Sequence, residues 1–462
     1  MDPTTPSPPS AVPIAGEGRI PSARRRLVLI IALVAAGLAA RMPLLPYPGF
    51  LHDQDQFVMW AHVAATRGLA HVYDRPDAGR STPLCNYPPV QVYVCRALAS
   101  IYPFVGGTPL NAAMVDSIVR REDSPEVRSA YVLFKFPAVL ADLLTAALLF
   151  LWLIRRAPLV FATIVAGIYA LHPAILHDSS VWGQIDAIPT LFTLCALEAA
   201  RRKKFEWMWA WAILAALTKP QALIFLPVWL SLSILNFGND ARKWLRSAGV
   251  IALVVVATVA PFYGGWAGVW EAFVGAASYY PFTHLNGFSG WFLKDPLLAP
   301  ELGGNLLESY SRDDRALFAG LTPRVLGLIG VFVIWLVAVQ VLRRRRGDDD
   351  SLEWAARLVP LGFFVVSTQM HERYLYPAIA IWAWTARPDW RWWIGWLLLG
   401  ACVAVNMLWV WIGPCAGDFL RIQEQLFHRP WLGQPPGVWC SFILIAVLFV
   451  TLARVVREAT QK

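Results

Sequence analysis

Two carboxylates stand two residues apart in the segment Leu51–Trp60, at Asp53 and Asp55. The segment directly follows the first long apolar run of the chain. An isolated pair of acids is usually only hydrated, but a carboxylate held beside a substrate hydroxyl can act as a general base. The choice between these interpretations depends on the other polar groups that reach the same place.

Five further polar clusters interrupt the apolar sequence. They are Asn86–Pro89, His172–Asp186, Thr218–Gln221, His284–Asn286 and Gln369–Tyr374. Within them, Lys219, His371 and Arg373 suit an anionic group such as a phosphate. Lysine offers a point charge for this purpose, and arginine offers a planar fork of donors.

Each cluster also has a plain structural interpretation. Lys219 could extend its ammonium group to the membrane surface while its methylenes stay in apolar surroundings. His371-Glu372-Arg373 could be a salt-bridge knot, and Trp182-Gly183-Gln184 an aromatic anchor with a turn. Pro220 favours the functional interpretation of Lys219, because a helix-breaking proline suggests a loop that faces a polar cavity.

The composition is that of a polytopic membrane protein. Of 462 residues, 57% are apolar and 15% charged, and the mean hydropathy is +0.49. Soluble domains carry about 25% charged residues. Repeated apolar runs approaching about 18 residues predict transmembrane helices, so we expect an all-α fold. The net charge of +9 does not indicate nucleic-acid binding, because the basic residues cluster at the ends of the apolar runs.

Six cysteines, at positions 85, 95, 195, 402, 415 and 440, show no CxxC or Cys/His spacing. They therefore predict neither a zinc site nor a disulfide framework. Cys85 and Cys95 could still pair if both face an oxidising compartment.

Basic clusters predict the topology. Arg24-Arg25-Arg26 precede the first apolar run, which places the N-terminus in the cytosol, and each inward crossing ends in basic residues. We expect twelve membrane helices with both termini cytosolic. The expected spans are Leu27–Ala40, Ala130–Ile154, Leu159–Leu171, Val181–Ala200, Trp207–Leu217, Ala222–Leu235, Ala248–Tyr263, Val325–Leu342, Leu358–Thr368, Leu375–Ala386, Trp392–Ile412 and Val438–Leu452.

One transmembrane domain, residues 23–462, is expected to follow a disordered cytosolic tail, residues 1–22, which is rich in proline and serine. The domain would carry two long outer loops, 46–129 and 265–322. In the first loop we interpret Val90–Val105 as a helix at the membrane surface. All the polar clusters then fall on the outer face, where ionisable groups near membrane depth are candidates for function.

Together the clusters predict one outward-facing site. Asp53 would be a general base, and Lys219, His371 and Arg373 would bind a phosphate. A base, an anion-binding group and an apolar scaffold suggest a lipid-phosphate donor whose sugar is transferred to an acceptor hydroxyl.

The motifs resemble those of the GT-C superfamily of membrane glycosyltransferases, which use polyprenyl-phosphate sugars. The most similar group is the dolichyl-phosphate-glucose glucosyltransferases of eukaryotic N-glycan assembly and their bacterial relatives. The shared features are Asp53 followed seven residues later by Trp60, Tyr87-Pro88-Pro89, Pro173–Asp178, a short loop with Lys219 and Gln221, and His371-Glu372-Arg373 in place of His-Glu-Lys. The arginine and the segment after Asp178 depart from the family pattern.

The resemblance implies a GT-C-like fold and an inverting transfer on the extracytoplasmic face. It assigns the base to Asp53 and stabilisation of the leaving phosphate to Lys219, His371 and Arg373. It further implies substrate contacts from Asp55, Tyr87, Asp178, Gln184, Gln221 and Glu372. No metal cofactor is expected, although Asp53, Asp55 and Asp178 could together hold a divalent cation. The expected partners are a polyprenyl-phosphate sugar, a lipid-linked or cell-envelope glycan acceptor and membrane lipids, and not nucleic acid.

Three alternatives remain open: a lipid flippase or transporter, an O-antigen ligase or polymerase, and a noncatalytic protein that binds a lipid-linked glycan. Carriers tend to place binding residues near the membrane midplane and to show repeated halves. This sequence shows no repeat and gathers its polar clusters on one predicted face. The absence of recognisable organelle-retention signals favours a bacterial plasma membrane.

Overall fold

The structure, a computed structural model, describes residues 22–74, 84–275, 280–294, 312–317, 319–411 and 429–460. These residues are mostly helical, with one short pair of strands. The predicted disordered tail, residues 1–22, lies outside the described residues except for Ser22, and so do parts of the second predicted outer loop.

The helices follow one another along the chain with short connections. In the first half they are α1 (Ala23–Arg41), α2 (Leu51–Thr66), α3 (Pro89–Gly106), α4 (Ala112–Val119), α5 (Pro125–Leu153), α6 (Leu159–Ala170), α7 (Pro173–Leu176), the π turn η2 (His177–Trp182), α8 (Ala187–Arg201), α9 (Phe205–Ala216), the 3-10 turn η3 (Pro220–Phe225) and α10 (Leu226–Phe237). In the second half they are α11 (Ala241–Val259), α12 (Trp266–Val274), α14 (Pro323–Arg344), α15 (Asp349–Val366), α16 (Tyr376–Trp384), α17 (Trp390–Val410) and α19 (Pro436–Thr460). The strands are β1 (His284–Leu285) and β2 (Met370–His371).

Local sequence signals explain several helix starts. The Ser124 side chain accepts a hydrogen bond from the Val127 amide, and Pro125 takes the first position of α5. Thr322 and Pro323 do the same at the start of α14. A serine or threonine cap satisfies an amide that the helix cannot, and proline loses nothing at a position whose amide has no helical partner.

The described chain has six helices long and apolar enough to cross a membrane. They are Pro125–Leu153, Pro220–Phe237, Ala241–Phe262, Pro323–Arg344, Trp390–Val410 and Pro436–Thr460. A seventh is possible if Leu159–Ala170 and Pro173–Trp182, which meet at a 44° bend, form one broken span. The prediction of an integral membrane protein is confirmed at this level.

All twelve predicted spans coincide at least partly with helices, but twelve crossings stay a prediction. A span needs about 20 residues, whereas α8, α9 and α16 have 15, 12 and 9. The largest difference lies at Val181–Asp186, predicted as the start of a span. These residues finish the π turn and a short link, because Gly183 adopts a positive φ of 82° that ends helical geometry there.

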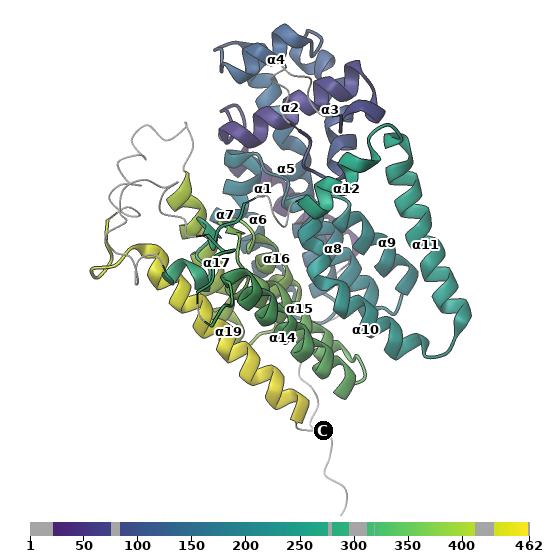
Figure 1. Cartoon of the computed structure of the whole chain (residues 1–462), viewed down its shortest axis with the longest axis vertical. Coiled ribbons are helices and arrows are strands. Elements are labelled where there is room, and N and C mark those ends of the chain that lie inside the picture. Colours follow the sequence, from purple (N-terminus) through teal and green to yellow (C-terminus); the bar gives the residue numbers. More distant parts are fainter. Residues whose placement is uncertain are drawn as a thin grey trace, which may run out of the picture.

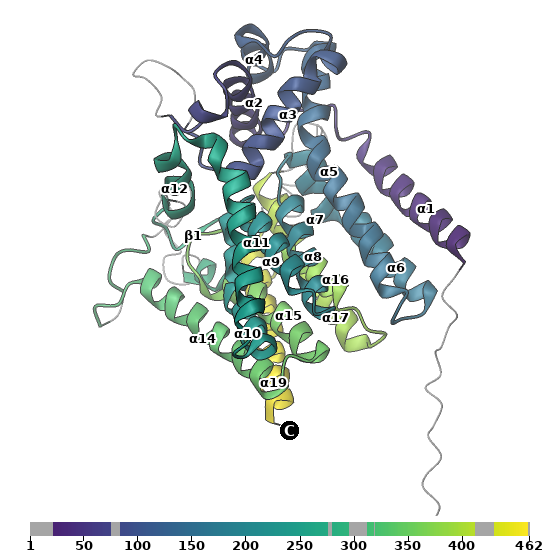
Figure 2. The same ribbon diagram turned by 90° about the vertical axis from the view of Figure 1, so that its right-hand side faces the viewer.

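The first predicted outer loop is itself helical. Val90–Val105, predicted as a surface helix, lies within α3, while α2 and α4 were not expected. Figure 1 shows α2, α3 and α4 gathered at one end of the molecule, with the tip of α19 at the opposite end. Figure 2 shows α1 running beside α5 and α6. Cys85 and Cys95 are both buried free thiols.

A buried ion pair ties four helices together inside the bundle. Arg41 Nη2 lies 3.2 Å from Asp142 Oδ2, and both side chains are fully buried. Arg41 also donates to the Gly37 and Ala170 carbonyls, and Asp142 accepts from the hydroxyls of Tyr169 and Tyr376. Every charge in this network is hydrogen-bonded, as burial requires. The network links α1, α5, α6 and α16.

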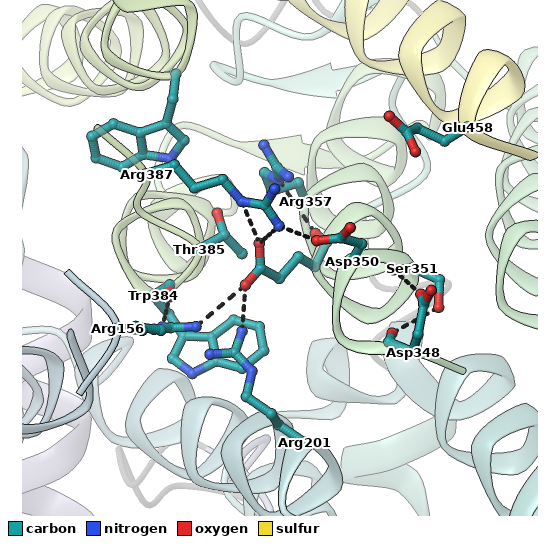
Figure 3. Close-up of polar contacts among 12 residues, drawn as sticks. Arg156, Arg201, Asp348, Asp350, Ser351, Arg357, Trp384, Thr385, Arg387 and Glu458 are labelled. Atoms are coloured by element: carbon teal, nitrogen blue, oxygen red, sulfur yellow. Dashed lines mark hydrogen bonds and ion pairs between the residues drawn. The ribbon is translucent and has the colours of Figure 1, made fainter. Parts of the chain in front are cut away.

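A second charged cluster gathers residues predicted to lie at cytosolic helix ends. Glu353 of α15 accepts hydrogen bonds from Arg156, Arg201 and Arg387, at 3.2, 2.7 and 2.8 Å. Figure 3 shows the three guanidinium groups directed at this one carboxylate. The guanidinium of Arg201 also lies 3.8 Å from the ring centre of Trp384. The ends of α5, α8 and α16 therefore meet at α15.

The Arg41 network predicts a large stability effect. Arg41→Met should lower the free energy of unfolding by about 3 kcal/mol or more, because Asp142 then remains charged and buried without its cation. Thermal unfolding in detergent micelles measures this. The double variant Arg41→Met/Asp142→Leu should recover much of the loss. A double variant no more stable than the single one would contradict the ion-pair explanation.

Candidate active site

One cavity of about 450 Å³ gathers most of the predicted site residues. Its wall includes the first turn of α2, the segment before α3, the end of η2, the link between α9 and η3, α12 and the link between β2 and α16. Seven predicted residues line it: Asp53, Tyr87, Lys219, Gln221, His371, Glu372 and Arg373. They come from four segments far apart in the sequence, so the helix packing alone brings them together.

Asp55 does not line this cavity. It lies in the first turns of α2 with Asp53, and two residues turn a helix by about 200°, so the two carboxylates leave on different sides. Asp55 instead pairs with Arg121, with Nη1 3.3 Å from Oδ1. Burial raises the pKa of Asp55, and Arg121 offsets part of that rise. The contacts of Asp55 are those of a structural ion pair.

Gln184 and Asp178 lie behind the cavity wall. The Tyr87 hydroxyl donates to Gln184 Oε1 at 3.2 Å, so Gln184 orients the ring that faces the cavity. Burial raises the pKa of Tyr87, which keeps the phenol protonated. Asp178 is fully buried in η2, and neither of its carboxylate oxygens has a hydrogen-bond partner in the described part of the chain.

Arg373 is the centre of the site, because three carboxylates share its guanidinium. Nη2 lies 3.7 Å from Asp53 Oδ2, Nε lies 3.6 Å from Asp186 Oδ2, and Nη1 donates to Glu372. Burial alone would lower the pKa of Arg373, but Asp53 and Glu372 raise it well above its ordinary value. Burial would likewise raise the pKa of Glu372, but Arg373 and His371 lower it to about 2. Both groups are charged at neutral pH.

Lys219 has the donors that remain available to a ligand. Its ammonium donates to Asp186 Oδ1 at 2.6 Å and lies 5.8 and 5.9 Å from the ring centres of Tyr87 and Tyr374. An ammonium group has three N–H donors. Among the described residues no other hydrogen bond from it is formed, and Lys219 lines the cavity. Two donors can therefore reach a bound anion.

Asp186 is the functional residue that the sequence reasoning missed. It stands at the N-cap of α8, where an aspartate usually accepts from a backbone amide, yet it makes no such cap. Its two oxygens face Lys219 and Arg373 instead. The stretch His172–Asp186 had been noted as polar, but a one-dimensional pattern does not show that its last residue joins two distant cations.

Asp53 is held through one of its two oxygens. The indole N–H of Trp182 donates to Oδ2 at 2.7 Å, and Arg373 approaches the same oxygen. Within the described residues Oδ1 has no hydrogen-bond partner, and the side chain is 18% exposed at the cavity. Trp60, seven residues along α2, is on the same face as Asp53 and packs 5.6 Å from the Tyr87 ring.

Two short strands connect the second outer loop to this site. β1 pairs in parallel with β2, which aligns Leu285 with His371. His371 Nδ1 lies 3.7 Å from Glu372 Oε2, and its ring packs 4.9 Å from Tyr374. Asn286, directly after β1, lines the cavity. The predicted cluster His284–Asn286 therefore does reach the His371 motif.

The site is more acidic than the sequence suggested. Asp53, Asp186 and Glu372 surround the two permanent cations Lys219 and Arg373. Even so, no group of three or more histidine, cysteine, aspartate or glutamate side chains is placed to hold a metal ion in the described ranges. The prediction that no metal is needed stays a prediction.

Residues 125–368 match the family model of Glycosyltransferase family 87. The chain belongs to this family. It is therefore a membrane glycosyltransferase, and the prediction is confirmed to that extent. The matched part of the transferase contains Trp182, Asp186 and Lys219. No curated protein matches the chain. Similarity to dolichyl-phosphate-glucose enzymes in particular stays a resemblance of motifs.

The Glu372–Arg373 pair of the transferase predicts a pH-dependent contribution to stability. A carboxylate whose pKa falls on folding from its ordinary 4.5 to about 2 stabilises the fold above pH 4.5 and loses this contribution as the pH falls towards 2. Glu372→Gln should therefore unfold at a lower temperature than the parent at pH 6, and the difference should shrink below pH 4.5. Thermal unfolding between pH 3 and 7 measures it.

Glu271→Gln is the matched control, because Glu271 is an exposed glutamate at the same cavity on α12. It should leave the unfolding temperature unchanged at each pH. A Glu372→Gln difference that does not vary with pH would contradict the ion-pair contribution.

Proposed function

We propose that this glycosyltransferase moves a monosaccharide from a polyprenyl-phosphate donor to a hydroxyl of a lipid-linked or cell-envelope glycan. The observation that carries the proposal is that one cavity presents both the Asp53 carboxylate and the Lys219 ammonium group. The first suits the proton of an acceptor hydroxyl, and the second suits the oxygens of a departing phosphate.

In the proposed reaction Asp53 is the general base. Its Oδ1 takes the proton of the acceptor hydroxyl while the acceptor oxygen forms a bond to the anomeric carbon of the sugar. The bond between that carbon and the phosphate oxygen breaks, and the polyprenyl phosphate leaves with the electron pair. Attack from the face opposite the leaving group inverts the anomeric centre, and no covalent enzyme intermediate is needed.

Lys219 is the principal group for the leaving phosphate. Arg373 already faces three carboxylates, so its donors are mostly engaged, whereas Lys219 has two N–H groups left for the cavity. Asp186 holds Lys219 from behind the wall. His371 and Gln221 line the same cavity and complete the polar surroundings of the donor head group.

The size of the cavity favours a small transferred group. Pockets for small ligands have volumes of about 300 to 1,000 Å³, and this one has about 450 Å³. Such a space suits one sugar with its phosphate better than a whole oligosaccharide, so a ligase or polymerase is the less suitable alternative. Membership of a glycosyltransferase family likewise argues against a flippase.

We place the reaction on the extracytoplasmic face of a bacterial plasma membrane. The proposal rests on the basic helix ends, which are predicted to be cytosolic. Three of them, at Arg156, Arg201 and Arg387, do meet at Glu353 (Figure 3), and none of these residues lines the cavity.

The base assignment predicts that Asp53→Asn lowers the rate of transfer by about 100-fold or more, the usual share of a general base. The purified protein is given a panel of radiolabelled polyprenyl-phosphate hexoses and pentoses, with membrane lipid extract as acceptor. Asp55→Asn is the control, because Asp55 pairs with Arg121 outside the cavity, and it should retain activity. Full transfer by Asp53→Asn would exclude Asp53 as the base.

The phosphate assignment predicts that Lys219→Met weakens binding of the product polyprenyl phosphate by about tenfold or more, since charge-assisted hydrogen bonds are lost. Inhibition of transfer by added polyprenyl phosphate, or its direct binding to inactive protein, measures this. Lys243→Met changes an exposed lysine on α11 and should leave binding unchanged. Equal affinity of the parent and Lys219→Met would remove Lys219 from the phosphate site.

A further inference from the structure

We infer that Trp182 is the positioning residue of Asp53, an inference that rests on the proposed role of Asp53 as the base. The indole N–H donates to Asp53 Oδ2 at 2.7 Å, across 129 positions of sequence. The bond crosses from the π turn η2 to the first turn of α2. π-helical turns are rare and frequently lie at functional sites.

The indole of Trp182 has no free face for a substrate. The side chain is only 1% exposed. Phe50 stacks on the ring at 4.5 Å, the Arg373 guanidinium lies 5.3 Å from its centre, and Trp411 packs edge-on at 5.7 Å. Although Trp182 borders the cavity, this enclosure excludes stacking on a sugar ring. Its chemical contribution is the N–H that it directs at Asp53.

Two donors on one oxygen set the direction of the carboxylate. Trp182 and Arg373 both approach Oδ2, so the plane of the Asp53 group is defined and Oδ1 remains for the acceptor hydroxyl. A hydrogen bond to a carboxylate also favours its ionised form. Trp182 therefore keeps the base in the right orientation and in the state able to accept a proton.

The backbone connects the two partners independently of the side chains. The Phe50 amide, three residues before Asp53, donates to the Trp182 carbonyl at 2.8 Å. A Cβ atom on Gly49 would lie 2.5 Å from that carbonyl oxygen, so only glycine allows this approach without a shift. From inside the bundle, Lys135 donates to the carbonyls of Ser180 and Tyr47, both at 2.8 Å. The linker before α2 and the π turn are thus held as one unit.

The decisive experiment is the pH dependence of transfer by Trp182→Phe, which keeps an aromatic ring but lacks the N–H. The variant should lose about tenfold in kcat, because one hydrogen bond to a charged group is absent. Its acidic limb should move to higher pH, since a carboxylate with fewer donors takes up a proton more readily. The KM for the donor should change little.

Trp411→Phe is the matched control, because Trp411 packs in the same aromatic cluster without a hydrogen bond to Asp53. It should leave the acidic limb where it is in the parent. A Trp182→Phe profile that coincides with the parent, while Asp53→Asn is inactive, would overturn the positioning role and leave the base assignment intact. An active Asp53→Asn would instead overturn the proposed function.

Gly49→Ala provides a second test if Trp182→Phe does not fold. It displaces the Trp182 carbonyl without altering either side chain of the hydrogen bond, so it should lower kcat and move the acidic limb in the same direction. Gly249→Ala on α11 is its control, because an added Cβ there meets nothing within 4 Å. Parental kcat and pH profile in Gly49→Ala would contradict the proposed unit.

Discussion

The site depends on one buried guanidinium that three carboxylates share. Arg373 faces Asp53 from α2, Asp186 from the link before α8 and its own neighbour Glu372. A buried arginine needs such partners, because taking its charge out of water is costly unless the lost hydration is replaced. The planar fork in turn sets where each carboxylate lies. One side chain thus connects the first outer segment, the middle of the chain and the segment before α16.

This constraint also decides how a charged substrate can be received. The carboxylates outnumber the permanent cations, so an anionic donor is not attracted by a broadly positive cavity. Local donors decide instead, and the Lys219 ammonium has the largest number left. Asp186 keeps that ammonium in place from behind. Because Arg373 and Trp182 meet at Asp53 Oδ2, the groups proposed for the phosphate and for the base belong to one connected network.

Particular elements show how far sequence patterns reach. The spacing of seven from Asp53 to Trp60 correctly suggested that the two residues act together, since two helical turns bring them to one face of α2. The spacing of two from Asp53 to Asp55 suggested a pair, yet the same helix turns them apart. At His172–Asp186 the polar character was visible in the sequence. The π turn that directs Trp182 at Asp53 was not, because no local propensity distinguishes it from an ordinary helix.

The amino-acid sequence by itself determined a helical membrane protein, from long apolar runs with basic ends, and it located seven residues that line one cavity. These features depend on side-chain type and local spacing, which a linear pattern contains. The tertiary structure alone decided the partners: Asp186 with Lys219, Asp55 with Arg121, and Trp182 with Asp53. Hydrogen bonds and ion pairs act over about 3 to 4 Å, so their partners are chosen by how distant helices pack.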